Sequence, residues 1–289
     1  GALLLIVLLA FGLRLAGLNA QSMWRDEVDA LRFSQEPLAT VIGNFTRPGW
    51  NGPLYYLLLR GWTALAGQSP MALRYFSLCF GVLGVALLYR LGRDWFSPRA
   101  GTIAALLMAA APYMVWYSQE VKMYALLTVL VPGLLWLFHR ACTGGGWWAW
   151  AALPALVWLA VATHVMAALA VPVMAVLFVL WWPAARRYWR LALLALAAVV
   201  VPVFVALPWA LPLLLRGGDI GHRFRSLPAM AEMMLHAFSR GILGTWRLLP
   251  MTVALFGLLA GTLLPAREPR WRYVGALWAW MGVPLLGLY

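Results

Sequence analysis

Long apolar runs, separated by short segments that hold most of the charged residues, recur along the whole chain. Hydrophobic residues make up 64% of the 289 residues and charged residues only 11%, against about 25% charged residues in a typical soluble domain. A chain of this size cannot bury so much apolar surface inside itself, so lipid must serve as its solvent. Because a membrane-crossing helix needs roughly 20 mostly apolar residues, the pattern predicts an all-α, polytopic bundle of transmembrane helices.

The apolar runs predict a single transmembrane domain, 1–289, which we expect to be truncated at both ends. About nine spans are expected, at residues 1–20, 70–91, 100–117, 119–139, 147–163, 165–183, 190–213, 247–264 and 271–289. Residues 1–20 could also be a signal peptide, but the many later runs favour a first span. Segment 53–67 is too short to cross a membrane and contains Arg60, so we predict an interfacial helix there.

Basic residues in the short connections predict the orientation of this domain. If 53–67 does not span, four basic connections fall on one side, near residues 90–99, 140, 186–190 and 267–272. The positive-inside rule makes that side cytoplasmic. Segments 21–69 and 212–246 are then two extracytoplasmic loops, and 114–124 also faces outward. These outward segments are basic as well, which suggests an anionic ligand such as a phosphate.

The net charge of +13 could suggest nucleic acid as a partner. The basic residues, however, lie in short loops between apolar runs rather than on one soluble face, so we expect no nucleic-acid binding. Membrane lipids are the partners that such loops usually contact.

Two polar clusters interrupt the apolar runs. The chain has nine acidic residues, and four of them follow the first run closely: Asp26, Glu27, Asp29 and Glu36. The second cluster is 116–124, in which Tyr117, Glu120 and Tyr124 would share one face of a regular helix while Lys122 would point elsewhere. If all four serve one cavity, this helix must begin late or irregularly. Either cluster could also be an ordinary helix end, with a polar loop or a snorkelling lysine.

Two shorter segments add candidate residues. Residues 51–56 open the predicted interfacial helix, where Pro53 suits a first helical position and Tyr55 fits an aromatic belt even without a function. His164 lies between two spans on the outward side, where a packing histidine is more common than a ligand. The sequence contains no glycine-rich phosphate loop, no nucleophile elbow and no metal-spaced set of His and Cys.

Taken in order, these segments resemble the GT-C superfamily of membrane glycosyltransferases. The similarity is greatest to bacterial members related to protein O-mannosyltransferases and to the lipid A aminoarabinose transferase, and it covers about residues 5–215. Each motif alone is weak, and their order is the specific signal. The motifs are Arg14, Trp24-Arg25-Asp26-Glu27 (family W-x-D-E), residues 51–56 (family H-P-P-L-Y-Y), Ala72-Leu73-Arg74, residues 91–96, residues 117–124 (family Y-S-Q-E-x-R-x-Y), Thr163-His164 and Leu207-Pro208-Trp209.

The sequence departs from the family pattern at three positions. Asn51 stands where the family usually has His, Gly52 where it has Pro, and Lys122 where it has Arg. A lysine can neutralise a phosphate, but as a point charge rather than a fork of donors. The departures therefore bear on how a phosphate-bearing donor would be held.

The resemblance implies a glycosyltransferase that moves a sugar from a polyprenyl-phosphate donor to a glycolipid, glycan or protein acceptor of the cell envelope. It implies an integral protein of the bacterial inner (plasma) membrane, with an extracytoplasmic active site and an inverting displacement. By motif position, Asp26 is the expected base, and Glu27 is expected either to support Asp26 or to orient the acceptor. Lys122 is the first candidate for the donor phosphate, ahead of Arg74 and Arg25. The residues expected to position the substrates are Glu120, Tyr124, Tyr55, Asn51 and His164.

No cofactor is expected. Some members of the superfamily use a divalent metal, but Asp26 and Glu27 alone are too few ligands for one, so we predict metal independence.

Two other functions stay open at this stage. A lipid or sugar transporter or flippase would place charges within spans and show broken helices and repeated halves, whereas the charges here cluster near helix ends. A non-catalytic subunit of an envelope-assembly complex would need no acidic pair.

Overall fold

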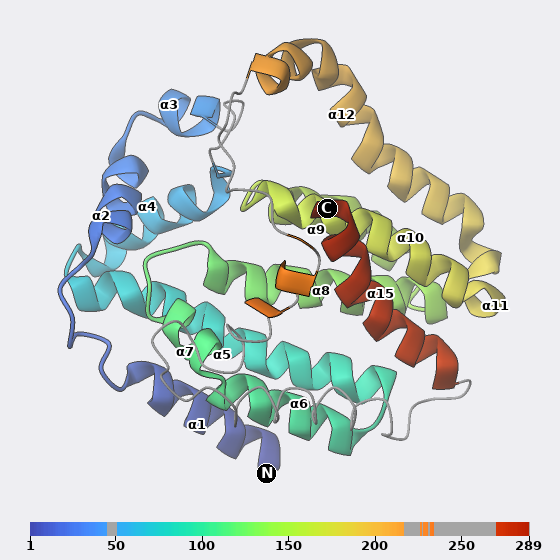
Figure 1. Cartoon of the computed structure of the whole chain (residues 1–289), viewed down its shortest axis with the longest axis horizontal. Coiled ribbons are helices and arrows are strands. Elements are labelled where there is room, and N and C mark those ends of the chain that lie inside the picture. Colours follow the sequence, from blue (N-terminus) through green and yellow to red (C-terminus); the bar gives the residue numbers. More distant parts are fainter. Residues whose placement is uncertain (45–50, 217–225, 227, 231, 234–269, 289) are drawn as a thin grey trace.

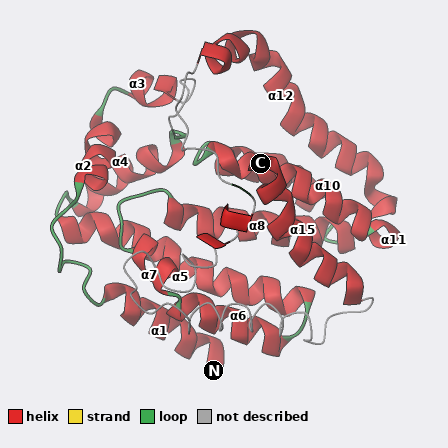
Figure 2. Cartoon of the chain, in the orientation of Figure 1, coloured by secondary structure: helices red, strands yellow, loops and turns green. Residues whose placement is uncertain are grey.

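The computed structural model describes residues 1–44, 51–216, 226, 228–230, 232–233 and 270–288. Within these ranges every regular element is a helix, and short loops join the helices (Figure 2). The all-α class expected from the sequence is therefore confirmed. The expected span 247–264 and most of the expected loop 212–246 lie outside the described residues.

The helices follow the apolar runs, with shifted boundaries. The α-helices are α1 (Ala2–Leu15), α2 (Arg25–Gln35), α3 (Leu38–Gly43), α4 (Leu54–Ala66), α5 (Pro70–Trp95), α6 (Pro98–Ala110), α7 (Pro112–Ser118), α8 (Tyr124–Thr143), α9 (Trp147–Val161), α10 (Ala170–Leu180), α11 (Trp182–Ala185), α12 (Trp189–Arg216) and α15 (Arg270–Leu288). Two 3₁₀ helices, η2 (Val165–Leu169) and η3 (Arg186–Tyr188), lie before α10 and α12.

The expected count of nine spans is not confirmed. Among the described residues, α5, α8 and the run Trp182–Val205 are each long and apolar enough to cross a membrane. Helices α6 and α7 give a fourth candidate if the bent pair is one span. The apolar helices α1 and α9, and the run Val165–Leu180, are shorter than a full span needs.

Helix α5 is central, because it packs against α1, α4, α6, α7 and α8. At its start, Ser69 Oγ accepts a hydrogen bond from the Ala72 amide at 3.2 Å, and Pro70 occupies a first-turn position where its missing N–H is not needed. The same start recurs at α6 with Ser97 and Pro98. Figure 1 shows α5 crossing the molecule from the side of α2 and α4 to the side where α15 begins.

The third expected span is broken between α6 and α7, which meet at a bend of 62°. Pro112 begins α7 and has no N–H to donate to the carbonyl of Met108. The buried Arg14 of α1 supplies donors instead, to Met108 at 3.1 Å and to the Ala109 carbonyl at 3.0 Å. Its Nε also donates to Ser118 Oγ at 3.1 Å. Arg14 therefore ties α1 to both halves of the broken helix.

The fourth expected span begins later than its apolar run suggested. Helix α8 starts at Tyr124, after an irregular stretch over residues 119–123. Gln119 holds this stretch, because its Nε2 donates to the carbonyls of Arg14 at 2.9 Å and Ala16 at 2.8 Å. The second polar cluster thus has the late and irregular helix start that a shared cavity requires.

The basic connections that predict orientation lie together at one end of the molecule. Arg93, before the α5–α6 connection, and Arg140, before the α8–α9 connection, line one pocket. Arg187 of η3 lies against the α8–α9 turn, and Tyr273 near the start of α15 packs against the ring of Phe96. Helices α2, α3 and α4 lie on the opposite side in Figure 1. The predicted interfacial helix α4 is thus remote from the basic connections.

Gly81→Ala is expected to destabilise the protein. A Cβ at position 81 of α5 would lie 2.1 Å from Ser118 Oγ and 3.0 Å from Arg14 Nε. The resulting shift should lower the unfolding free energy by about 1–3 kcal/mol, measured as a lower thermal midpoint in detergent. Gly61→Ala is the control, because a Cβ there meets nothing within 4 Å and alanine favours helix. Equal midpoints in the two variants would contradict the placement of Arg14 against α5.

Candidate active site

Glu27 and Arg74 form a buried ion pair where α2 meets α5, called here the Arg74–Glu27 clamp. Arg74 Nε donates to Glu27 Oε1 at 2.9 Å, and Nη2 donates to Oε2 at 2.6 Å. Paired hydrogen bonds of this kind are the strong form of an arginine–carboxylate contact. The other three N–H groups of Arg74 donate to backbone carbonyls at 2.8 to 3.2 Å, those of Leu18, Gln21 and Ser22. All five guanidinium donors are therefore used within the protein.

Glu27 also joins segments that are distant in sequence. Its Oε1 accepts a hydrogen bond from the Val121 amide at 3.2 Å, and Oε2 accepts one from the Trp24 amide at 3.3 Å. The Trp24 contact is the reach-back of an acidic residue at the third position of a helix. The clamp therefore fixes the start of α2, the α1–α2 connection and the stretch 119–123 against α5.

Asp26 and Lys122 meet beside this clamp. Lys122 Nζ lies 3.5 Å from Asp26 Oδ2, and the side chains are 14% and 49% exposed, respectively. Successive residues of a helix point about 100° apart, so Glu27 enters the core while Asp26 faces outward. The result is an accessible carboxylate next to a mostly buried ammonium group.

Glu120 is a second carboxyl group near the pair. It is buried and accepts a hydrogen bond from Trp116 Nε1. Burial is the main cause that raises the pKa of Glu120 to about 7. The hydrogen bond from Trp116 and the charge of Lys122 oppose this rise, while Glu27 and Asp26 add to it. Near neutral pH, Glu120 is therefore divided between its neutral and charged forms.

Tyrosines line the same region. The rings of Tyr117 and Tyr124 meet edge to face, with their centroids 4.7 Å apart. Tyr124 is 38% exposed, although the charges of Glu120 and Asp26 are near enough to act on it. It is thus placed to contact a molecule bound at the pair.

Sequence reasoning named Tyr55 but missed Tyr56. Tyr55 is fully buried and shares a hydrogen bond of 3.0 Å with Ser77 Oγ. Burial raises the pKa of Tyr56, a hydrogen bond with Asn51 lowers it, and the nearby Tyr124 and Asp26 raise it. Tyr56 therefore lies within electrostatic reach of Asp26, while Tyr55 lies within reach of Glu27 and Glu120. The sequence could not distinguish the two residues, because they are adjacent at the start of α4.

The start of α4 docks on the end of α9. The Leu54 amide donates to the Ala162 carbonyl at 2.9 Å. A Cβ at Gly52 would lie 2.0 Å from that carbonyl oxygen, so glycine at this position permits a close backbone approach. His164 caps η2: its Nδ1 accepts a hydrogen bond from the Met166 amide at 3.2 Å. Burial lowers the pKa of the His164 imidazole. The docking brings the segments of Asn51 and His164 together.

Arg25 is turned away from this cluster. It is 90% exposed, and its Nε lies 3.6 Å from Asp29 Oδ2, one turn along α2. The predicted residues that gather around the clamp are Asp26, Glu27, Arg74, Glu120, Lys122 and Tyr124.

In the part of the chain that the structure describes, no three side chains of His, Cys, Asp or Glu could together hold a metal ion. Metal independence stays a prediction.

The fold is that of a known class of membrane protein. It matches the crystal structure of ArnT from Cupriavidus metallidurans, solved with undecaprenyl phosphate bound, with a TM-score of 0.60 and 18% sequence identity. The match covers 99% of this chain and 59% of the ArnT chain, so this chain spans about three fifths of that protein. The likeness confirms the expected GT-C fold, and the protein is an integral membrane protein.

Residues 47–211, more than half of the chain, match the dolichyl-phosphate-mannose-protein mannosyltransferase family. The chain belongs to this family. The matched range includes Arg74, Glu120 and Lys122, and it begins after Asp26 and Glu27. A comparison with curated proteins gives no match.

Glu27→Gln is expected to lower stability far more than Asp29→Asn does. The first change leaves the buried Arg74 without its counter-charge, at a cost of about 3–5 kcal/mol. The second removes an exposed pair of the kind that contributes roughly 0–1 kcal/mol. Both residues lie on α2, and the thermal unfolding midpoint of each variant is measured in detergent. A Glu27→Gln midpoint as high as that of Asp29→Asn would show that the clamp does not hold this end together.

Proposed function

We propose that this protein transfers a sugar from a polyprenyl-phosphate donor to an acceptor outside the cytoplasm. Family membership and the ArnT fold support a glycosyltransferase, and the undecaprenyl phosphate bound in ArnT supports a lipid-phosphate donor. The observation that carries the assignment of the site is the approach of Lys122 Nζ to Asp26 Oδ2 at 3.5 Å, beside a buried clamp.

The reaction needs a base and a cation in these relative positions. The acceptor hydroxyl or amine attacks the anomeric carbon and loses its proton to the Asp26 carboxylate. The bond between that carbon and the phosphate oxygen breaks, and polyprenyl phosphate leaves as an anion that Lys122 stabilises. When the donor phosphate engages Lys122, the Asp26 carboxylate is released from its ion pair and can accept the proton. Direct displacement inverts the anomeric centre.

Among the cations proposed from the sequence to bind the phosphate, the contacts support Lys122. All five donors of Arg74 already serve Glu27 and the backbone, so its proposed role is to position the site. Arg25 is exposed and pairs with Asp29. Lys122 is the cation next to the accessible carboxylate, and its single ammonium group suits a phosphate as a point charge.

The proposed location is the bacterial inner membrane, with the site on the extracytoplasmic side. Twenty residues of α5 separate Arg74 from Asp94 at the basic end, a rise of about 30 Å, which is the thickness of a bilayer core. If the basic connections face the cytoplasm, Asp26 and Lys122 lie at the outer face. There the half-exposed Asp26 is accessible to a glycolipid, glycan or protein acceptor of the cell envelope.

The same geometry argues against transport. A transport pathway would place ionisable residues at mid-membrane depth, between helices that line it. Arg74 lies in the second turn of α5, and Lys122 lies just before α8. The charged cluster thus occupies helix ends, where surface chemistry on a membrane-bound donor takes place.

Asp26→Asn is expected to reduce sugar transfer by about 100-fold or more, because a positioned general base contributes that much. The assay uses the full-length protein in membranes with a pool of labelled polyprenyl-phosphate sugars. The product should carry the anomer opposite to that of the donor, and a chelator should leave transfer unchanged.

Asp29→Asn is the matched control, since it makes the same chemical change one turn along α2 on an exposed side chain. It should transfer like the wild type. Equal transfer by the Asp26 and Asp29 variants would remove Asp26 from the mechanism, while a folded wild type inactive with every donor tested would count against the transferase itself.

The KM for the donor is expected to rise with pH, because the pKa of Glu120 is about 7. Below that pH the neutral carboxyl leaves the charge of Lys122 to the donor phosphate. Above it, the carboxylate offsets Lys122 and repels the phosphate, an effect of about 1 kcal/mol or roughly fivefold in KM. Glu120→Gln should keep a low, flat KM from about pH 6 to 8. A Glu120→Gln profile that still rises would assign the titration to another group.

A further inference from the structure

A second charged pocket lies at the end of the molecule remote from Asp26 and Lys122. It has a volume of about 380 Å³ and lies between the C-terminal ends of α5 and α8. The residues that line it are Arg90, Arg93, Asp94, His139, Arg140, Thr143, Gly144 and Gly145. The proposed transfer reaction uses none of them.

The arginines of this pocket are held in place by an internal framework. Asp94 Oδ2 accepts hydrogen bonds from Arg90 Nε at 2.9 Å and from Trp136 Nε1 at 3.0 Å, and Arg93 Nε lies 3.4 Å from Oδ1. The guanidinium groups of Arg90 and Arg140 both lie over the Trp136 ring, each 5.8 Å from its centroid. Within the described residues, Arg90 and Arg93 use Nε for these contacts, so their terminal nitrogens are available to a ligand.

The pocket has more positive charge than its surroundings offset. Three guanidinium groups and one carboxylate give a net charge of +2 with His139 neutral. The ends of α5 and α8 together supply the equivalent of about one negative charge through their unpaired carbonyls. Arg187, which lies against the α8–α9 turn, adds another positive charge at the rim. Membrane topology and the helix ends therefore account for only part of the positive charge of this pocket. A bound anion would balance the rest.

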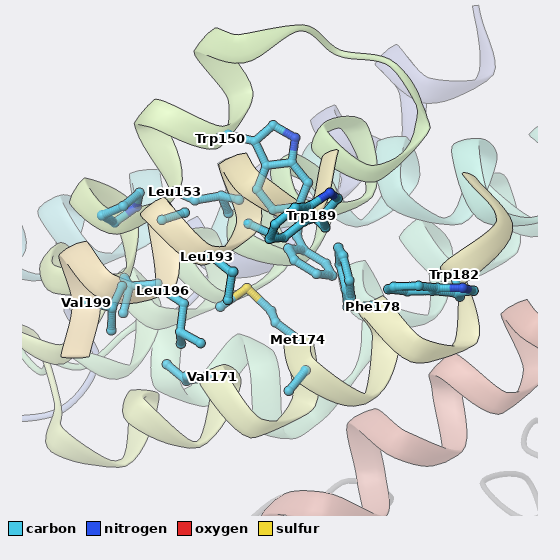
Figure 3. A pocket seen from close by; sticks show the side chains of 16 residues that line it. Trp150, Leu153, Val171, Met174, Phe178, Trp182, Trp189, Leu193, Leu196 and Val199 are labelled. Atoms are coloured by element: carbon cyan, nitrogen blue, oxygen red, sulfur yellow. The ribbon is translucent and has the colours of Figure 1, made fainter. Parts of the chain in front are cut away.

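An apolar groove begins on the neighbouring face of α8. It lies between α9, α10 and α12, and aromatic and aliphatic side chains line it (Figure 3). Phe138 lines the groove and the next residue, His139, lines the basic pocket. Trp150 of the groove contacts the ring of Tyr188. The guanidinium of Arg187 lies over that ring, 4.8 Å from its centroid. A hydrocarbon slot thus adjoins the cationic pocket.

We propose that the basic pocket binds the phosphate group of an anionic membrane lipid on the face opposite the reaction centre. Basic pockets between transmembrane helices are the usual sites for such headgroups. Arginine suits them because its planar fork of donors matches a phosphate. The adjoining groove favours a lipid over free phosphate as the source of that anion. The inference is independent of the proposed transfer reaction.

Arg140→Gln is the test variant and Arg190→Gln is its matched control. Both remove one arginine whose guanidinium lies over a tryptophan, at 5.8 Å for Arg140 and 5.4 Å for Arg190. Of the two, Arg140 is the one that lines the pocket. Neither makes an ion pair with a described carboxylate, so neither change leaves an acidic partner exposed.

The experiment measures lipid binding to the full-length protein by native mass spectrometry and thermal unfolding. The probes are phosphatidylglycerol, phosphatidylcholine as the zwitterionic comparison, and inorganic phosphate. Phosphatidylglycerol should bind and stabilise the wild type more than phosphatidylcholine does. Arg140→Gln should weaken this binding about tenfold, the effect of one charge-assisted contact, while Arg190→Gln stays within about twofold of the wild type.

Equal weakening in the two variants would overturn the proposal, because it would mean diffuse attraction to a basic surface. Protection by inorganic phosphate that matches that of phosphatidylglycerol would overturn the lipid source and leave a free-phosphate site. Arg93→Gln is the second variant if Arg140→Gln does not fold, and it should weaken binding in the same way.

Discussion

The buried pair of Glu27 and Arg74 is the contact on which this end of the molecule depends. A carboxylate and a guanidinium removed from water are favourable only when every remaining donor and acceptor is satisfied. Here the guanidinium uses all five donors, and the carboxylate accepts two backbone amides as well. The pair therefore does more than join α2 to α5. It sets the path of the backbone on both sides, and so decides where Asp26 and Lys122 stand.

A second buried arginine, Arg14, also fixes the path of the backbone. Arg14 takes over the backbone carbonyls that the break before Pro112 leaves without partners, and Gln119 fastens the following turn to α1. Because α7 and the stretch 119–123 are anchored in this way, α8 can begin late. A continuous helix through this region would direct Lys122 away from Glu120 and from α2.

The sequence predicted the class of fold and the segments of the site better than their detailed contacts. Apolar runs located α5, α9, α12 and α15 to within a few residues, since hydropathy is a local feature of the sequence. The expected count of nine spans is not confirmed, because among the described residues a bend and 3₁₀ turns interrupt runs that hydropathy alone treats as continuous. The order of the motifs predicted Asp26, Glu27 and Lys122 as site residues. It could not show that Glu27 and backbone carbonyls use all five donors of Arg74, because that depends on how α2 and α5 pack.

We propose separate roles for these residues: the Arg74–Glu27 clamp holds the site in place, and Lys122 binds the donor phosphate. The most direct measurement is a structure of the full-length protein with a polyprenyl phosphate bound. The account predicts the phosphate within hydrogen-bond reach of Lys122 Nζ, with both hydrogen bonds between Arg74 and Glu27 intact. A phosphate bound to Arg74, with Glu27 displaced from it, would contradict the account.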